Sequence, residues 1–204
     1  MDRKIGEGLQ YRVYREGGGL ARKEPKKREE MVETLRKWHD SRQEVQENAD
    51  RAVERRRKAV ERLEEGGFDF SLLGDPEFCE DGTVLQDRAQ VAGEVMSGAR
   101  LSKKKEVVDD YVQLLLQLWE QGIGDTIYNF TENTGYVDGR LVHLDFGELV
   151  FSKNRVKEEI RERKWLEKWS YTDDLSGDIR PYFRERMAEE ITVEALESRW
   201  KEKV

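Results

Sequence analysis

The segment from Leu141 to Glu148 carries the strongest chemical signal in the sequence. It reads Leu-Val-His-Leu-Asp-Phe-Gly-Glu, so an alternating apolar run ends at Asp145 and Gly147 follows. A run of this kind predicts a strand, and a glycine frees the backbone to turn directly after it. A strand that ends in this way delivers the Asp145 carboxylate to a surface where it can hold a metal ion.

Three further polar residues precede this strand and could serve the same cation. Asp125, Asn129 and Asn133 lie between a strongly apolar segment and the predicted hairpin that ends at Asp145. Taken singly, each is readily explained by a turn, because Asn and Asp favour turns. Taken together they supply the hard oxygen donors that suit Mg²⁺. The candidate metal ligands are therefore Asn129, Asn133 and Asp145.

A glycine-rich turn near the N-terminus could hold phosphate. Gly6 and Gly8 precede strand-like residues that include Val13, and the glycines at 17–19 close a predicted hairpin. Backbone amides at such a turn approach phosphate oxygens closely because no side chain blocks them. Lys23 follows one hairpin later, where its ammonium group could reach the same phosphates. The alternative for this residue is an exposed strand lysine.

Helices must position these groups. Residues 26–65 are strongly helical, with apolar or small residues at most positions of a 4-3 repeat over residues 31–63. The repeat favours a helix packed on the core; the alternative, a coiled-coil or homodimer seam, is disfavoured by Arg42, Arg56 and several alanines. Ser41 begins a capping-box pattern, so either one long helix runs through or a second helix starts there.

The second half of the chain is predicted to be mostly helical. The most apolar helix covers residues 107–119 with Ser102 as its cap, and residues 153–169 form another helix. Pro181 begins a further helix, and Thr192 caps the last one. Five aromatic side chains of this region are expected in the core: Trp165, Trp169, Tyr182, Phe183 and Trp200.

Composition restricts the class of protein. The chain has 204 residues, 40% charged and 36% hydrophobic, which is enough apolar material for one domain or a small two-lobed unit. A formal charge of −7 argues against nonspecific nucleic-acid binding, and the basic residues within 51–58 are expected to be solvated.

The single cysteine, Cys79, excludes an internal disulfide. No apolar run approaches the ~18 residues of a membrane span, so we expect a cytoplasmic protein.

The order of these parts resembles the protein-kinase-like fold. Gly6 and Gly8 look like the first glycines of the kinase glycine-rich loop, with Tyr11 where a third glycine is usual and Val13 as its valine. Lys23 is similar to the kinase lysine that binds the ATP phosphates. The resemblance therefore implies that Gly6, Gly8, Val13 and Lys23 bind the nucleotide.

The resemblance continues to residue 148 and includes Asp145-Phe146-Gly147, which is similar to the kinase metal-binding motif. Kinases place a catalytic Asp, usually after a His, ahead of four residues and an Asn. Asp125 lacks the His, and Asn129 follows it after only three residues. If the spacing to the metal-binding motif sets the register instead, Asn133 takes the Asn role and Tyr128 falls where the base should be.

The resemblance implies an α+β fold with two lobes. Residues 1–92 would form a small antiparallel-sheet N-lobe with the long helix, and residues 93–204 a mostly helical C-lobe. The implied activity is ATP- and Mg²⁺-dependent phosphate transfer, with Asp125 and Asp145 as catalytic residues and a small molecule or a protein as acceptor. Two alternatives stay open: a pseudokinase or nucleotide-sensing module, and a helical interaction protein that uses the stripe over 31–63.

Overall fold

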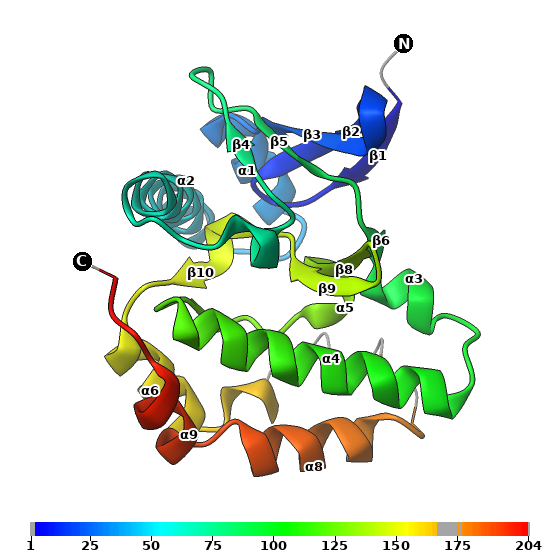
Figure 1. Cartoon of the computed structure of the whole chain (residues 1–204). Helices are drawn as coiled ribbons and strands as arrows, with labels where there is room; N and C mark the ends of the chain where they lie inside the picture. The colour runs from blue at the N-terminus through cyan, green and yellow to red at the C-terminus, as the bar shows by residue number, and fades with distance from the viewer. Residues whose placement is uncertain (1–2, 167–174, 176, 204) are drawn as a thin grey trace. The chain divides into compact units, whose positions relative to one another are not determined.

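The structure is a computed structural model that describes residues 3–166, 175 and 177–203. The fold is α+β, with an antiparallel sheet at its N-terminal side and a mostly helical remainder (Figure 1). Its contacts divide the chain into two units. Unit 1 comprises residues 1–66 and 75–88, and unit 2 comprises residues 67–74 and 89–204.

Unit 1 is built on a five-stranded antiparallel sheet of order β1-β2-β3-β5-β4. The strands are β1 (Lys4–Glu7), β2 (Tyr11–Arg15), β3 (Leu20–Pro25), β4 (Glu77–Phe78) and β5 (Val84–Asp87). Both predicted glycine turns join the first three strands. In the first, the Gly8 amide donates to the Tyr11 carbonyl at 3.0 Å. The second is the 3-10 turn η1 (Gly17–Gly19), where Gly18 has a φ of 68° that glycine adopts without strain.

Two helices cover the region predicted to be helical in unit 1. They are α1 (Arg28–Leu35) and α2 (Arg42–Glu65). The Ser41 hydroxyl accepts a hydrogen bond from the Glu44 amide at 3.3 Å, so the capping-box pattern does start a second helix. The alternative of one continuous helix over residues 26–65 is therefore wrong.

The apolar stripe of these two helices is buried within unit 1. The two helices pack against each other through one cluster: Met31, Val32, Leu35, Val45, Ala49 and Ala52. Arg56 also has an internal role, since its guanidinium donates to the carbonyls of Gln10 and Lys26 at 2.8 and 3.2 Å. Trp38 differs from the rest of the stripe, because it lies in the turn between the helices and is 64% exposed. Within unit 1, the apolar residues of the repeat over 31–63 that form this cluster therefore face the core.

Unit 2 is organised around α4 (Leu101–Glu120), which contains the apolar helix predicted over 107–119 and buries most of its apolar side chains. Figure 1 shows α8 (Arg180–Glu190) running alongside it, and α9 (Val193–Arg199) packs on it as well. The helix begins at Leu101 after Arg100, which makes no side-chain cap, so the predicted cap at Ser102 is wrong. Within the described residues, no helix is both long enough and apolar enough to cross a membrane.

Two small antiparallel sheets lie beside α4. One has the order β6-β8-β9, and the other pairs β7 with β10. Their strands are β6 (Gln90–Val91), β7 (Gly124–Asp125), β8 (Thr134–Val137), β9 (Arg140–His143) and β10 (Leu149–Val150). The strand β6 pairs with β8, so residues from 89 onward group with unit 2.

Short helices complete unit 2. They are η2 (Phe70–Leu73), α3 (Ala92–Met96), α5 (Phe130–Asn133), η3 (Phe146–Glu148), α6 (Lys153–Arg161) and η4 (Lys164–Leu166). The helix predicted over 153–169 is wrong in its length, because α6 ends at Arg161 and Arg163 then adopts a positive φ of 50°. The part of that prediction beyond residue 166 lies outside the described residues.

The other predictions for this region have mixed outcomes. Pro181 lies in the first turn of α8, and the Thr192 hydroxyl caps α9 by accepting from the Ala195 amide, as predicted. Trp165, Phe183 and Trp200 are buried, as expected of core aromatics. Tyr182 is wrong as a core residue, because it is partly exposed and its hydroxyl donates to Asp109. Trp169 lies outside the described residues.

The two serines predicted as caps provide a matched test of helix capping. Ser41→Ala removes the acceptor for an orphan amide of α2 and should destabilise the protein by about 1 kcal/mol. Ser102→Ala, inside the first turn of α4, should change the stability by less than about 0.5 kcal/mol. Urea denaturation measures both, and an equal cost for the two variants would contradict this assignment of the helix starts.

Candidate functional site

The β8–β9 hairpin brings two of the predicted metal ligands together. Asn133 ends α5, and its carbonyl accepts a hydrogen bond from the Leu144 amide at 2.7 Å. Thr134 and His143 are paired at the start of the hairpin. Asn133 therefore lies beside the residue that precedes Asp145. Both predicted ligands are partly exposed, as residues that bind a ligand must be.

The Asp145 side chain is held by its own turn. One carboxylate oxygen, Oδ1, accepts a hydrogen bond from the Gly147 amide at 3.1 Å and so caps η3. This bond fixes the side chain at the end of the hairpin without burying it. The strand and the turn after it were both predicted from the sequence, although the strand itself ends at His143, two residues before Asp145.

Asn129 is less suited to a metal than Asn133. Its Nδ2 donates to Glu132 Oε2 at 2.9 Å, and its Oδ1 accepts from the Thr131 hydroxyl at 3.3 Å. The amide oxygen that a cation would need is thus engaged within the turn around α5. The sequence left the choice between Asn129 and Asn133 open, and Asn133 is the one whose backbone bonds to Leu144, the residue before Asp145.

The charge available for a cation at this point is small. Within the described residues, no group of three or more His, Cys, Asp or Glu side chains is arranged to hold a metal. A cation between Asn133 and Asp145 would have to take its other ligands from a phosphate group and water. Mg²⁺ is commonly bound in this way, through one or two protein ligands and the phosphates of a substrate.

Asp125, predicted to be catalytic, is a buried residue at the centre of a hydrogen-bond network. Its Oδ2 accepts from the Tyr111 hydroxyl at 2.9 Å. Its Oδ1 accepts from the amides of Ile127 and Tyr128 at 2.8 and 3.1 Å. The imidazole of His143, which is fully buried, places Nε2 at 3.5 Å from Oδ2. Sequence reasoning missed His143 and Tyr111, because no motif links them to Asp125.

These surroundings keep Asp125 charged. Burial alone would raise the pKa of Asp125, but the His143 imidazole and the two backbone amides outweigh it and lower that pKa below its ordinary value. Asp125 is only 1% exposed. An acceptor hydroxyl would have to enter the interior and displace one of these partners to reach the carboxylate.

Tyr128 occupies the position where the alternative register requires a base. Its backbone has a φ of 58°, which is strained for a residue other than glycine. The ring is buried and meets Trp165 edge-on, with centroids 5.9 Å apart. Burial raises the pKa of the Tyr128 hydroxyl well above its ordinary value, so this side chain stays neutral.

In the first glycine turn of unit 1, the fold does not require glycine at position 8. Gly6 lies in β1 opposite Val13, and a Cβ there would make only ordinary contact with that valine. Gly8 has neither a positive φ nor any atom within 4 Å of an added Cβ. A glycine without a structural reason is compatible with close approach of a ligand to the backbone.

Two lysines lie in β3 or directly after it. Lys23 is paired with Val13 of β2 and Val84 of β5, and it is buried rather than exposed on its strand. Lys26, which sequence reasoning missed, places Nζ at 2.6 Å from Glu7 of the turn. The hydrogen bond from Lys26 is the main cause that lowers the pKa of Glu7 to about 2. Lys26 therefore anchors the turn that carries Gly8.

Comparison with known proteins adds no family to this description. No protein-family model matches the chain, and no curated protein matches it. The function is therefore inferred from the geometry of the site.

The two aspartates should respond differently to the same substitution. Asp125→Asn leaves buried donors facing an amide and should destabilise the protein by about 2 to 3 kcal/mol. Asp145→Asn keeps an oxygen for the Gly147 amide at a partly exposed position and should cost less than about 1 kcal/mol. Urea denaturation measures both. Equal losses of unfolding free energy in the two variants would show that the Asp125 carboxylate contributes no more to stability than that of Asp145.

The lowered pKa of Asp125 predicts a pH dependence of stability. The ionised carboxylate stabilises the folded state fully above its unfolded pKa of about 3.8, and this contribution is lost as the pH falls through the lower folded pKa. The difference in unfolding free energy between wild type and Asp125→Asn should therefore shrink below about pH 4. Denaturation series at several pH values measure this difference; growth of the difference towards acid would contradict the prediction.

Proposed function

We propose that the chain binds ATP with Mg²⁺ in a two-lobed, protein-kinase-like arrangement and transfers a phosphoryl group to an acceptor. The observation that carries the proposal is the hairpin that holds Asn133 beside Asp145 through the Leu144 amide. In this proposal the oxygen-bearing side chains of these two residues hold a Mg²⁺ ion that bridges phosphate oxygens. Asp145 supplies the charge, and Asn133 supplies a neutral oxygen.

Residues of unit 1 support the nucleotide part of the proposal. In this scheme the backbone at Gly6 and Gly8 approaches the phosphates of the nucleotide, Val13 contacts the nucleotide, and the Lys23 ammonium group binds phosphate. The absence of a fold requirement at Gly8 and the anchoring of Glu7 by Lys26 both favour a turn built for a ligand.

Transfer in this scheme does not depend on Asp125. Phosphoryl transfer of the kinase type proceeds through a loose transition state, so catalysis consists mainly of positioning and charge neutralisation. A buried Asp125 that stabilises the fold is compatible with such chemistry. Another group must then orient the acceptor hydroxyl.

A nucleotide-sensing module without phosphate transfer is the second candidate. The burial of Asp125 and the neutral, strained Tyr128 favour it, because both registers then lack a base that an acceptor can reach. A protein that works through its 31–63 stripe has less support, since the residues of that stripe that form the cluster of unit 1 are buried against one another.

Thermal unfolding with and without ATP and Mg²⁺ tests the proposal. A ligand at ~100 times its dissociation constant adds ~2.7 kcal/mol to the folded state and should raise Tm by several degrees. The shift should require both ATP and Mg²⁺, and it should be lost in Asp145→Ala and Asn133→Ala. Asn129→Ala is the matched control and should keep most of the shift.

The outcomes separate the candidates. No shift in the wild type at millimolar ATP would refute the proposed function, and equal losses in the two asparagine variants would refute the assignment of Asn133. Transfer of labelled γ-phosphate that survives Asp125→Asn but not Asp145→Ala would support the phosphotransferase. Binding of ATP without any turnover would support the sensor instead.

A further inference from the structure

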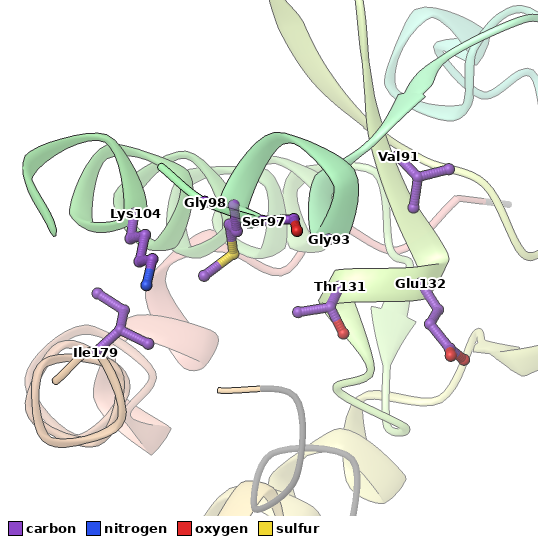
Figure 2. A pocket seen from close by; sticks show the side chains of 9 residues that line it. Val91, Gly93, Ser97, Gly98, Lys104, Thr131, Glu132 and Ile179 are labelled. Atoms are coloured by element: carbon purple, nitrogen blue, oxygen red, sulfur yellow. The ribbon is translucent and has the colours of Figure 1, made fainter. Parts of the chain in front are cut away.

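A cavity lies in each of the two units, and the two differ in how their charged groups are engaged. The cavity of unit 2 has a volume of about 510 Å³ and lies beside α3 and α5 (Figure 2). Its Glu132 carboxylate accepts a hydrogen bond from the Asn129 side chain, and its Lys104 ammonium group pairs with Asp178. The charged groups of this cavity are thus already engaged with other side chains.

The cavity of unit 1 lies between α2 and the hairpin of β4 and β5. Its volume is about 520 Å³, within the range of sites for small molecules. Val53 and Val60 are two turns apart on α2, so they lie on one face of that helix, and both are half-buried. Tyr11, Pro25 and Phe78 complete the apolar part of the lining. All the lining residues belong to unit 1, so the cavity is a feature of that unit alone.

Carboxylates line the same cavity from two elements. Glu61 and Glu64 come from α2, and Glu80 and Asp81 come from the turn after β4. Asp81 Oδ1 accepts a hydrogen bond from the Thr83 amide at 2.9 Å, and this bond lowers the pKa of Asp81. Within the part of the chain that the structure describes, the carboxylates of Glu64 and Glu80 have no hydrogen bond or ion pair. Each wall therefore offers a charged oxygen donor set to a ligand.

The two arginines of the lining do not neutralise these carboxylates. Arg57 donates to the carboxylates of Glu54 and Glu61 at 2.8 and 2.6 Å. The Arg56 guanidinium donates to two backbone carbonyls at 2.8 and 3.2 Å. Two guanidinium groups against four carboxylates give the lining a formal charge of −2. The cavity thus combines apolar surface with an excess of negative charge, which a cation with an apolar body complements.

We propose that the cavity of unit 1 binds an aliphatic diamine or polyamine, with its methylene groups against Val53 and Val60 and its ammonium groups at Glu64 and Glu80. An ammonium group and a carboxylate form a charge-assisted hydrogen bond, and the stem between two ammonium groups is apolar. A metal ion would leave the apolar lining unused. A monoamine would leave one carboxylate without a cation. The site shares no residue with the candidate nucleotide and metal site, so it goes beyond the proposed function.

Isothermal titration calorimetry at low ionic strength and without nucleotide tests the proposal. The probes are unbranched diamines with terminal amino groups, from diaminopropane to diaminooctane. One chain length should bind best, because the fold fixes the separation of the two carboxylates. The monoamine of the same length should bind at least about threefold more weakly, since it makes one ion pair fewer. Equal binding of all lengths, equal binding of the monoamine, or no binding of any probe would overturn the proposal.

Glutamine variants assign the ammonium groups to particular carboxylates. Glu64→Gln and Glu80→Gln should each weaken binding of the best diamine by about threefold. Both side chains are exposed, so neither variant should unfold the protein. Glu65→Gln is the matched control, because Glu65 is the next exposed residue of α2 and does not line the cavity. It should bind the diamine like the wild type. Equal losses in Glu64→Gln and Glu65→Gln would show attraction by general charge and overturn the site.

The position of the ligand can be checked at Cys79, the single cysteine of the sequence, which also lines the cavity and is half-buried. The readout is the rate at which its thiol reacts with dithiodipyridine, a neutral disulfide that does not consume amines. A saturating concentration of the best diamine should slow this reaction by at least about fivefold, because the ligand blocks access to the thiol. The urea-unfolded protein is the control and should show no effect of the diamine. An unchanged or faster reaction of the folded protein would place the ligand elsewhere and overturn the proposal.

Discussion

The buried carboxylate of Asp125 is the interaction on which the arrangement of unit 2 depends. It joins α4 through Tyr111, the turn before α5 through two backbone amides, and β9 through His143. The turn is the one that Asp125 itself begins, whereas α4 and β9 come from other parts of the sequence. Because β9 leads directly to Asp145, the same carboxylate fixes the hairpin that presents the candidate metal ligand. The interior network therefore helps to fix the strand that leads to Asp145.

Asp125 and Asp145 have the same side chain but differ in burial and in the number of their hydrogen-bond partners. The first is surrounded by donors, stays charged in the interior and holds elements together. The second makes one bond to its own turn and keeps its exposure, so it stays accessible to a ligand. A carboxylate with saturated partners stabilises a fold, whereas one with spare oxygen lone pairs can bind a cation.

Local signals in the sequence predicted the parts of the fold that local interactions determine. Ser41 and Thr192 start helices because each hydroxyl satisfies a backbone amide of its own first turn. Ser102 failed as a cap, since α4 starts one residue before it without any side-chain cap. The end of α6 was missed because the positive φ that follows it is at Arg163, and the sequence has no glycine there to indicate it. The burial of Asp125 could not be predicted, because its side-chain partners lie far away in the sequence and meet it only in the folded chain.

The central claim, that a metal-bound nucleotide lies at Asn133 and Asp145, is tested most directly by NMR with Mn²⁺ in place of Mg²⁺. A paramagnetic ion broadens the resonances of nearby nuclei, so it reports its own position in the folded protein. With ATP present, the amide signals of Asn133 and Asp145 should broaden first. Without ATP these signals should change little, because two protein ligands alone hold the ion weakly. Broadening of other amide signals, with those of Asn133 and Asp145 unaffected, would contradict the account.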